Sequence, residues 1–297
     1  MEELISVIMS TYNESINELQ QSIYSILNQT YSNLELIIVV DNPTNAPIIT
    51  YLNSLTDSRI KIIKNNTNLG LVASLNKALK SASGNYVARM DADDISLPDR
   101  LLTQILHMKN ESLDIVGGNL EFIDENGQTI SYQNFPRKQW KINFFLRWGN
   151  CVPHPTWLIK KDVYISLNGY RNIPRCEDYD FICRALQNKF KIGNVNKYVL
   201  KYRIRKSSIS NSNKGAQYLV RQYIANNRRN HLSEENIKNY ISSDRFKKNL
   251  KKYDDFQLKK SLLHKKPDFS IIIKLLGNKY TYCLALEKIG LKIRNIS

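Results

Sequence analysis

Residues 86–100 read YVARMDADDISLPDR, an apolar run that ends in three carboxylates within four positions. The apolar part, Tyr86–Met90, is typical of a buried strand. The carboxylates of Asp91, Asp93 and Asp94 would repel one another at the end of that strand unless a positive charge lies among them. Oxygen ligands of this kind suit Mg²⁺ or Mn²⁺, so the stretch predicts a divalent-cation site.

A simpler interpretation of this stretch is helix capping. Pro98 is typical of a first helical turn, and Pro98–Met108 has helical spacing of apolar residues. Asp94 or Ser96 would then cap that helix. Capping explains Asp94 better than it explains Asp91 or Asp93, so the cation site remains the main prediction.

The residues before this stretch alternate between apolar runs and amphipathic segments. We expect strands at Ile5–Met9, Leu34–Val40 and Ile60–Ile63, and helices at Asn17–Asn28, Pro47–Leu55 and Leu71–Ser81. Together with Tyr86–Met90 this gives a β-α-β-α-β-α-β order. That order predicts an α/β fold, with a mostly parallel, Rossmann-like sheet and helices on both faces.

The pattern after residue 110 is less regular. We expect a hairpin of Ile115–Ile123 and Thr129–Gln133 around the turn Asn126-Gly127, helices at Gln139–Trp148 and Asp178–Gln187, and strands at Thr156–Lys160 and Tyr198–Ile204. The polar stretch Ser207–Ser212 is a plausible domain edge. We therefore divide the chain into a catalytic domain, residues 1–212, and a basic helical C-terminal region, residues 213–297.

The composition excludes several classes of protein. With 297 residues, 42% of them hydrophobic and 24% charged, the chain is neither collagen-like nor largely disordered. The four cysteines lack metal-site spacing, which favours reduced thiols in a cytosolic protein. Neither GxGxxG nor a P-loop is present, which disfavours hydride transfer and ATP hydrolysis. The sequence shows no secretion signal and no run of about 18 apolar residues that would span a membrane.

The positive charge is concentrated towards the C-terminus. The whole chain has 43 basic and 27 acidic residues, and 19 of the basic but only 7 of the acidic ones lie from Lys214 onward. Such a tail favours an anionic partner: nucleic acid, an acidic membrane leaflet or a phosphorylated ligand. A solvated helical surface that binds nothing is the simpler alternative.

Polar side chains follow each of the four expected parallel strands. The segments are Ser10–Glu14, Asp41–Asn45, Asn65–Gly70 and Asp91–Asp94. Any one of them alone is weak evidence, since strand-to-helix turns favour Asp, Asn and Ser. Because ligands of open α/β sheets bind at the carboxyl ends of the strands, the four together predict one polar crevice.

At this point the sequence resembles the family 2 glycosyltransferases, which have the GT-A fold. The resemblance covers roughly Ile5 to Ser210 and depends on ordered segments rather than on one motif. These are SVIMSTYNE, LIIVVDNPT, NLGLVASLNKAL, YVARMDADDISLPDRL, the HPT of residues 154–156 and the CEDYDF of residues 176–181.

The resemblance implies a nucleotide-sugar site on the N-terminal half. The residues assigned to the donor are Ser10, Thr11, Tyr12, Glu14, Asp41, Asn68, Asp91, Asp93 and Arg205. Tyr12 would lie against the base, and Asp41 would accept hydrogen bonds from a uracil-type ring. Asp91 would lie near the ribose, and Asp93 would hold the Mn²⁺ or Mg²⁺ that bridges the diphosphate.

The resemblance also implies an acceptor site. Glu177-Asp178 matches the family's ED motif, whose Asp acts as general base in inverting members; Glu177 would contact the acceptor. First-turn helix acids are the simpler interpretation of this pair. His154 and Trp157 are further candidates for contact with a sugar, and a structural histidine and a buried aromatic side chain are the alternatives.

This sequence departs from the family pattern at three points, which limits how many of the family's residue roles can be assigned to it. Asn42-Pro43-Thr44 replaces the usual residues after the second-strand aspartate, which alters the loop beside the nucleotide. Arg205 stands where relatives often place a histidine, and arginine can contact a diphosphate but cannot bind a metal. The QxxRW motif of processive synthases is absent, which favours single addition over polymerisation.

The C-terminal region mixes lysine pairs with apolar and aromatic residues: Phe246, Leu250, Tyr253, Phe256, Leu258, Leu262 and Leu263. Basic amphipathic helices of this type lie on anionic lipid, so we expect peripheral contact with the inner face of the cell membrane. A helical subdomain packed on the catalytic body and a homodimer surface are the alternatives.

The main hypothesis is therefore a cytoplasmic, inverting, metal-dependent glycosyltransferase. It would move a sugar from a nucleotide sugar, UDP-linked in our prediction, to a lipid-linked oligosaccharide or a surface polysaccharide. A nucleic-acid-binding protein and a relative that binds nucleotide sugar without transfer are the alternatives. The acid-lined crevice disfavours the first of these, since it would repel a phosphate backbone.

Overall fold

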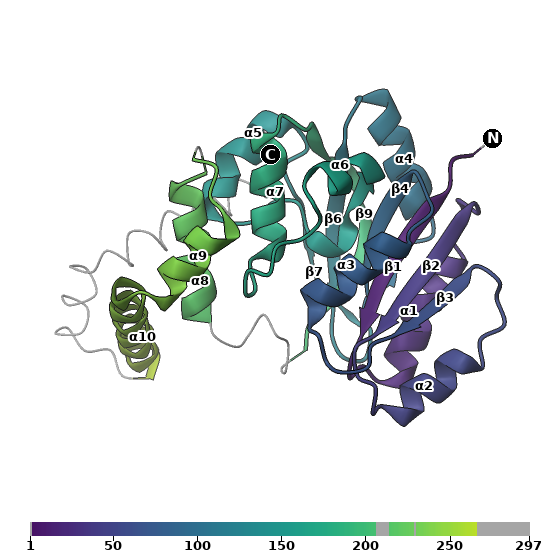
Figure 1. Ribbon diagram of the computed structural model, residues 1–297, viewed down its shortest axis with the longest axis horizontal. Coiled ribbons are helices and arrows are strands. Elements are labelled where there is room, and N and C mark those ends of the chain that lie inside the picture. The colour runs from purple at the N-terminus through teal and green to yellow at the C-terminus, as the bar shows by residue number, and fades with distance from the viewer. Residues whose placement is uncertain (1, 206–213, 229, 266–297) are drawn as a thin grey trace.

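The computed structural model describes residues 2–205, 214–228 and 230–265 of the 297-residue chain. Its centre is one nine-stranded sheet with strand order β3-β2-β1-β4-β8-β6-β9-β5, and β7 pairs with β6 outside this path. Figure 1 shows helices on both faces of the sheet and a group of three helices beside it. The predicted α/β class is confirmed.

The N-terminal half of the sheet is parallel, as predicted. Its strands are β1 (Ile5–Thr11), β2 (Leu34–Val40), β3 (Ile60–Lys64) and β4 (Tyr86–Asp91), and its helices are α1 (Ile16–Leu27), α2 (Ala46–Asn53) and α3 (Leu71–Ser81). Both ends of each of these seven elements lie within two residues of the prediction. Ser15 and Glu18 form a capping box at the start of α1, which fixes where that helix begins.

The second half of the sheet is mixed. Its elements are β5 (Ile95–Ser96), α4 (Arg100–Asn110), β6 (Ile115–Ile123), β7 (Thr129–Gln133), α5 (Gln139–Phe145), a 3₁₀ turn η1 (Leu146–Trp148), a second 3₁₀ turn η2 (His154–Thr156), β8 (Leu158–Lys160), α6 (Lys161–Ser166), α7 (Glu177–Gln187) and β9 (Ile192–Arg203). The β6–β7 hairpin is confirmed.

Three predictions in this half were incomplete. Helix α6 and the two-residue strand β5 were not predicted, and β9 begins at Ile192 rather than at Tyr198. Strand β9 runs parallel to β6 from the pair Ile115–Ile192 onward. Its first residues include Gly193 and Asn194, which are poor strand formers, so only the pairing with β6 shows that they belong to a strand.

The two faces of the sheet bury two separate clusters of apolar side chains. Successive residues of β1 contribute to opposite clusters: Val7 and Met9 belong to one, and Ile8 belongs to the other. This is the alternation that a strand covered on both faces requires. Residues of α1 and α4 cover the first cluster, and residues of α3 and α7 cover the second.

The helices α8 (Lys214–Asn226), α9 (Glu234–Ser242) and α10 (Asp244–Lys265) share the second of these clusters. Gly215 lies so close to α10 that a Cβ there would come within 2.9 Å of Leu250 and Tyr253. The rings of Tyr218 and Tyr253 stack with centroids 5.0 Å apart. A helical region after residue 213 is therefore confirmed as far as residue 265.

This packing corrects one expectation about the C-terminal region. Phe246, Tyr253 and Phe256 are at most 6% exposed, so they are not available to enter a lipid surface. The alternative of helices packed on the catalytic body holds for this part. Residues 206–213 and 266–297, including the expected domain edge, lie outside the described residues. No helix within the described part of the chain has the length and apolar character needed to cross a membrane.

Candidate active site

The three carboxylates that follow β4 lie close together in the folded chain. One oxygen from each of Asp91, Asp93 and Asp94 falls within 4.8 Å of the others. Strand β1 runs beside them, with Ser10 in register with Asp91, and Ser22 Oγ of α1 donates a 2.8 Å hydrogen bond to the carbonyl of Asp91. The carboxylates thus share one place at the carboxyl edge of the parallel strands, as the sequence predicted.

The electrostatics of this cluster show an excess of negative charge. Burial, together with the charges of Asp91 and Glu14, raises the pKa of Asp93 to about 7. Burial and the charges of Asp91 and Asp93 raise the pKa of Asp94 well above its usual range. Asp94 Oδ2 is buried and has no hydrogen-bond partner within the described residues. An oxygen-rich, under-compensated cluster of this kind fits a divalent cation.

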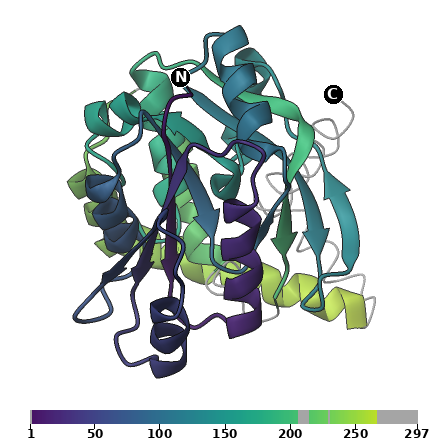
Figure 2. The same ribbon diagram turned by 90° about the vertical axis from the view of Figure 1, so that its right-hand side faces the viewer.

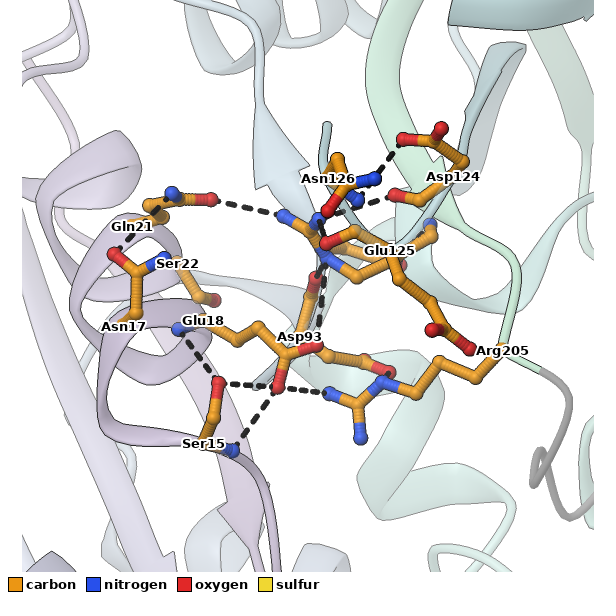
Figure 3. A network of polar contacts seen from close by, with 12 residues as sticks. Ser15, Asn17, Glu18, Gln21, Ser22, Asp93, Asp124, Glu125, Asn126 and Arg205 are labelled. Carbon is orange, nitrogen blue, oxygen red and sulfur yellow. Dashed lines mark hydrogen bonds and ion pairs between the residues drawn. The ribbon is translucent and has the colours of Figure 1, made fainter. Parts of the chain in front are cut away.

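Two arginines form ion pairs with the cluster. The Arg89 guanidinium, 3% exposed, pairs with Asp91 Oδ2. Arg205 Nε lies 3.2 Å from Asp93 Oδ2, and Arg205 Nη2 lies 2.9 Å from Glu18 Oε2. Figure 3 shows Arg205 between Asp93 and Glu18, so one guanidinium bridges the acid cluster and the start of α1.

A third arginine holds the backbone of the cluster in place. Arg203 is buried, and its Nε donates a 2.9 Å hydrogen bond to the carbonyl of Asp93. Its Nη1 donates to the carbonyls of Asp124 and Glu125, and its Nη2 donates to Gln21 Oε1. The backbone amide of Arg203 donates to Asp94 Oδ1 at 2.9 Å. The β6–β7 turn, α1 and the acid cluster are therefore tied together at one residue.

The turn after β1 is closed by Glu14. Glu14 Oε2 accepts hydrogen bonds of 2.7 Å from Thr11 Oγ1 and 2.8 Å from the Tyr12 amide. The Tyr12 side chain is 42% exposed beside this turn. Its ring is thus free to contact a planar ligand, whereas Thr11 and Glu14 shape the turn.

Asp41 lies at the end of β2 and is almost fully buried. Its Oδ1 accepts from Asn65 Nδ2 at 2.7 Å and from the Leu69 amide at 2.9 Å, and its Oδ2 accepts from the Gly70 amide at 2.9 Å. Gly70 has φ +83°, a conformation that favours glycine, and Asn68 Oδ1 accepts from the same amide. Asp41 therefore orders the loop before α3, and one acceptor position on Oδ2 remains.

Glu177 and Asp178 begin α7. Asn150 Nδ2 donates a 2.7 Å hydrogen bond to Asp178 Oδ2. Burial and the neighbouring Asp178 raise the pKa of Glu177 to about 7. Burial raises the pKa of Asp178, while the hydrogen bond from Asn150 and the charge of Arg89 oppose this.

Arg89 interacts with the carboxylates after β4 and also with the acids at the start of α7. It pairs with Asp91, and its charge also lowers the pKa of Glu177 and of Asp178. The charge of Asp91 in turn raises the pKa of Glu177. Arg89 is therefore the residue through which the acids after β4 and the acids of α7 are electrostatically linked.

The structure corrects the assignment of Trp157 to the acceptor. The Trp157 side chain is fully buried, and its Nε1 donates to the carbonyl of Val152 at 2.8 Å, so it has no surface for a sugar ring. His154 is 8% exposed, packs on Trp157 with centroids 4.4 Å apart and bonds Tyr170 Oη at 2.9 Å. Burial and Arg89 lower the pKa of His154 well below its usual range. These contacts favour the structural alternative for both residues.

Sequence reasoning missed three residues of this site: Glu18, Asn150 and Arg203. The spacing of Ser15 and Glu18 identifies a capping box, but nothing local shows that Glu18 also pairs with Arg205. Asn150 and Asp178 are 28 positions apart, and Arg203 and Asp93 are 110 positions apart. Contacts over such separations leave no periodic signal in a single sequence.

A family model gives the decisive comparison. The model described as "Glycosyl transferase family 2" matches residues 6–167, which is more than half of the chain. The chain belongs to this family. It is a glycosyltransferase with the GT-A fold, and the matched segment contains the turn after β1, Asp41 and the acid cluster.

Two curated relatives agree with this assignment, and one solved structure agrees with the fold. "O-antigen biosynthesis glycosyltransferase WbnJ" of Escherichia coli is 36% identical over 249 residues, which is 81% of this chain and 93% of WbnJ. "UDP-Glc:alpha-D-GlcNAc-diphosphoundecaprenol beta-1,3-glucosyltransferase WfgD" of E. coli is 30% identical over 212 residues, 70% of this chain and 80% of WfgD. The crystal structure of S. aureus TarS 1–349 in complex with UDP-GlcNAc superposes with a TM-score of 0.61 at 17% identity, covering 97% of this chain and 81% of TarS 1–349.

Proposed function

We propose that this glycosyltransferase moves a sugar from a UDP-sugar to a hydroxyl of a lipid-linked oligosaccharide or surface-polysaccharide acceptor, with Mn²⁺ or Mg²⁺ as cofactor. The observation that supports the proposal is that Arg89, which pairs with Asp91, also acts electrostatically on Glu177 and Asp178. One group of acids, after β4, suits a cation and a diphosphate. The other, at the start of α7, supplies a carboxylate that can take a proton.

The donor would bind along the carboxyl edge of the parallel strands. The exposed Tyr12 ring is placed to stack on the base, and the remaining acceptor position of Asp41 is placed to receive an N–H of a uracil-type ring. Ser10 lies in register with Asp91, near which we place the ribose. TarS was crystallised with UDP-GlcNAc, which supports UDP as the nucleotide of this fold.

Asp93 is the residue we assign to the metal, with Asp91 and Asp94 beside it. The unpartnered Asp94 Oδ2 and the raised pKa of Asp93 support this assignment, because both indicate that the described residues leave negative charge in the cluster uncompensated. A bound Mn²⁺ or Mg²⁺ would neutralise the negative charge that grows on the leaving diphosphate. Arg205 is the further cation that we place near that diphosphate.

Asp178 is the residue we assign as general base. In the transfer, the acceptor oxygen forms a bond to the anomeric carbon, and the bond from that carbon to the diphosphate oxygen breaks with its electrons. The acceptor proton passes to the Asp178 carboxylate, and the nucleoside diphosphate leaves. Attack opposite the leaving group inverts the anomeric centre. The hydrogen bond from Asn150 favours the ionised form of the carboxylate, which the reaction needs.

The acceptor class follows from the relatives and remains part of the proposal. WbnJ is named for O-antigen biosynthesis, and WfgD is named for transfer to a diphosphoundecaprenol-linked sugar. For an acceptor of this kind we propose that the enzyme acts in the cytoplasm, at the inner face of the membrane that holds the lipid carrier. The acid cluster disfavours nucleic acid as a partner, because it would repel a phosphate backbone.

A donor screen tests the proposal. Purified enzyme is incubated with UDP-, GDP- and dTDP-sugars, with Mn²⁺ or with EDTA, and release of nucleoside diphosphate is measured. We expect release from a UDP-sugar that requires the metal and that Asp93→Asn abolishes, while the exposed control Asp99→Asn retains it. The proposal would be contradicted if none of the nucleotide sugars released nucleoside diphosphate, or if release were equal with Mn²⁺ and with EDTA. Donor binding without turnover would support the non-catalytic alternative instead.

A further inference from the structure

Helix α5 presents large aromatic side chains to solvent. Trp140 is 64% exposed and Phe144 is 46% exposed, four positions apart and so on one side of the helix. Ile142 and Phe145, on the other side, are buried in the core. The helix therefore has a normal packed face and, in addition, an aromatic outer face that nothing in the described part of the chain covers.

The charge around these aromatics is all of one sign. No Asp or Glu occurs between Glu125 and Asp162, whereas Arg137, Lys138, Lys141 and Arg147 surround the exposed aromatic residues. The Lys141 ammonium lies 5.5 Å from the Trp140 ring centroid, and the Arg147 guanidinium lies 5.1 Å from that of Phe144. Within the described residues, only Arg137 of these four has a carboxylate partner, Glu111.

No acidic side chain is among the described residues that line the surface hollow beside α5. This hollow, of about 360 Å³, is lined by Arg147, Ala225, Asn226 and Arg228. Arg228 Nη1 donates to the carbonyl of Asn143, which ties the end of α8 to α5. We call Trp140, Phe144, Lys138, Lys141 and Arg147, together with this hollow, the α5 face.

We propose that the α5 face docks on an anionic phospholipid bilayer. Exposed tryptophan and phenylalanine with unpaired lysine and arginine match the interface of an anionic leaflet, where aromatic rings lie among the headgroups and cations neutralise phosphates. Arg147 and Arg228 line a hollow in which a headgroup phosphate could lie between two guanidinium groups. A second copy of the chain is a poorer occupant, because a symmetric interface would bring the same cations together.

This proposal moves the membrane contact away from the C-terminal helix. The apolar stripe of α10 is buried against α8 and α9, and only Leu258 among its apolar side chains is strongly exposed within the described part. In Figure 2, α10 (yellow-green) lies at the lower right of the view. Lys247, Lys248, Lys251 and Lys252 of α10 are exposed, but the aromatic side chains of this helix, Phe246, Tyr253 and Phe256, are buried. The proposal does not depend on the assignment of donor, metal or base.

Co-sedimentation with vesicles tests the α5 face. Full-length protein is mixed at low salt with vesicles of phosphatidylcholine alone or with 30% phosphatidylglycerol (about a physiological anionic fraction), and Trp emission is recorded in parallel. We expect binding to the anionic vesicles with a blue shift of the emission. Two variants should each weaken binding by roughly tenfold or more. One is the double variant Trp140→Ala with Phe144→Ala, and the other changes Lys138, Lys141 and Arg147 to Gln.

A matched variant in α10 separates the two surfaces. Changing Lys247, Lys248, Lys251 and Lys252 to Gln removes more charge than the triple change, but we expect binding to weaken by less than about threefold. All variants are checked for native circular dichroism. Failure of the unaltered chain to bind, unchanged binding by both α5 variants, or loss of binding in the α10 variant would each overturn the proposal. A dimer in solution that Trp140→Ala converts to a monomer would also overturn it, in favour of a second copy.

Discussion

Asn150 Nδ2 donates a 2.7 Å hydrogen bond to Oδ2 of Asp178, 28 positions further along the chain. The Asn150 side chain is itself fixed, because its Oδ1 accepts from the Val152 amide at 3.0 Å. An amide donor of this kind favours the ionised form of the carboxylate, against the burial that raises its pKa. The asparagine thus orients the carboxylate that we assign as base and opposes the rise in its pKa.

Replacing Asn150 tests this positioning role. In Asn150→Ala the pKa of Asp178 should rise, because its hydrogen-bond donor is lost while burial remains. Since the base must be ionised, the acidic limb of the profile of kcat/KM against pH should move to higher pH. At pH well above that limb the activity should recover in part. The exposed Asn53→Ala serves as control, and a profile that falls uniformly without moving would contradict the role.

Metal dependence of stability follows from the raised pKa of Asp93. The pKa of Asp93 is about 7 in the folded protein and about 4 in the unfolded chain. Without metal, the Asp93 carboxyl therefore loses its proton at lower pH in the unfolded chain than in the folded protein. The contribution of Asp93 to the free energy of unfolding of the metal-free protein should therefore decrease as the pH rises from about 4 to about 7. Mn²⁺ should raise Tm more at pH 8 than at pH 5.5, because at pH 5.5 it competes with protons. Asp93→Asn should remove most of that difference, which differential scanning calorimetry can measure.

Loop order at the donor site should depend on Asp41. In Asp41→Asn one carboxylate oxygen becomes an NH₂ group facing the amides of Leu69 and Gly70 or the side chain of Asn65. Each hydrogen bond to the charged Asp41 carboxylate contributes about 1.5–3 kcal/mol to the order of the loop before α3. Because we place the donor beside this loop, UDP should bind about 10- to 100-fold more weakly to the variant. Titration calorimetry with UDP and Mn²⁺ checks this. Unchanged affinity would show that the loop is not part of the donor site.

A buried ion cluster should dominate stability around α7. Asp180 is 1% exposed and contacts Arg171 at 3.0 Å and Arg184 at 2.7 Å, while Arg171 Nη1 donates to the carbonyl of Leu232 before α9. Asp180→Asn leaves two arginines without their carboxylate and should cost about 3–5 kcal/mol in the free energy of unfolding. The surface variant Asp57→Asn, which loses only Arg59, should cost under about 1 kcal/mol. Urea unfolding of both variants measures the contrast.

The sequence predicted the parallel half of the fold because its signals are local. Apolar periodicity placed β2 and α3 at their observed bounds, and the three carboxylates after β4 stand next to one another in the chain. The rest depends on tertiary contacts. Trp157 follows a loop, and the sequence does not distinguish a stacking platform from a core residue that is fully buried. Asn150 and Arg203 acquire their importance only when distant segments meet.

The measurement closest to the central claim compares transfer with donor binding in Asp178→Asn. Our account predicts that UDP-sugar and Mn²⁺ bind this variant within about twofold of the unaltered enzyme, while kcat for transfer falls by about 10²- to 10⁴-fold. The exposed Asp162→Asn should change neither quantity. Transfer by Asp178→Asn at the rate of the unaltered enzyme would contradict the claim that this carboxylate receives the acceptor's proton.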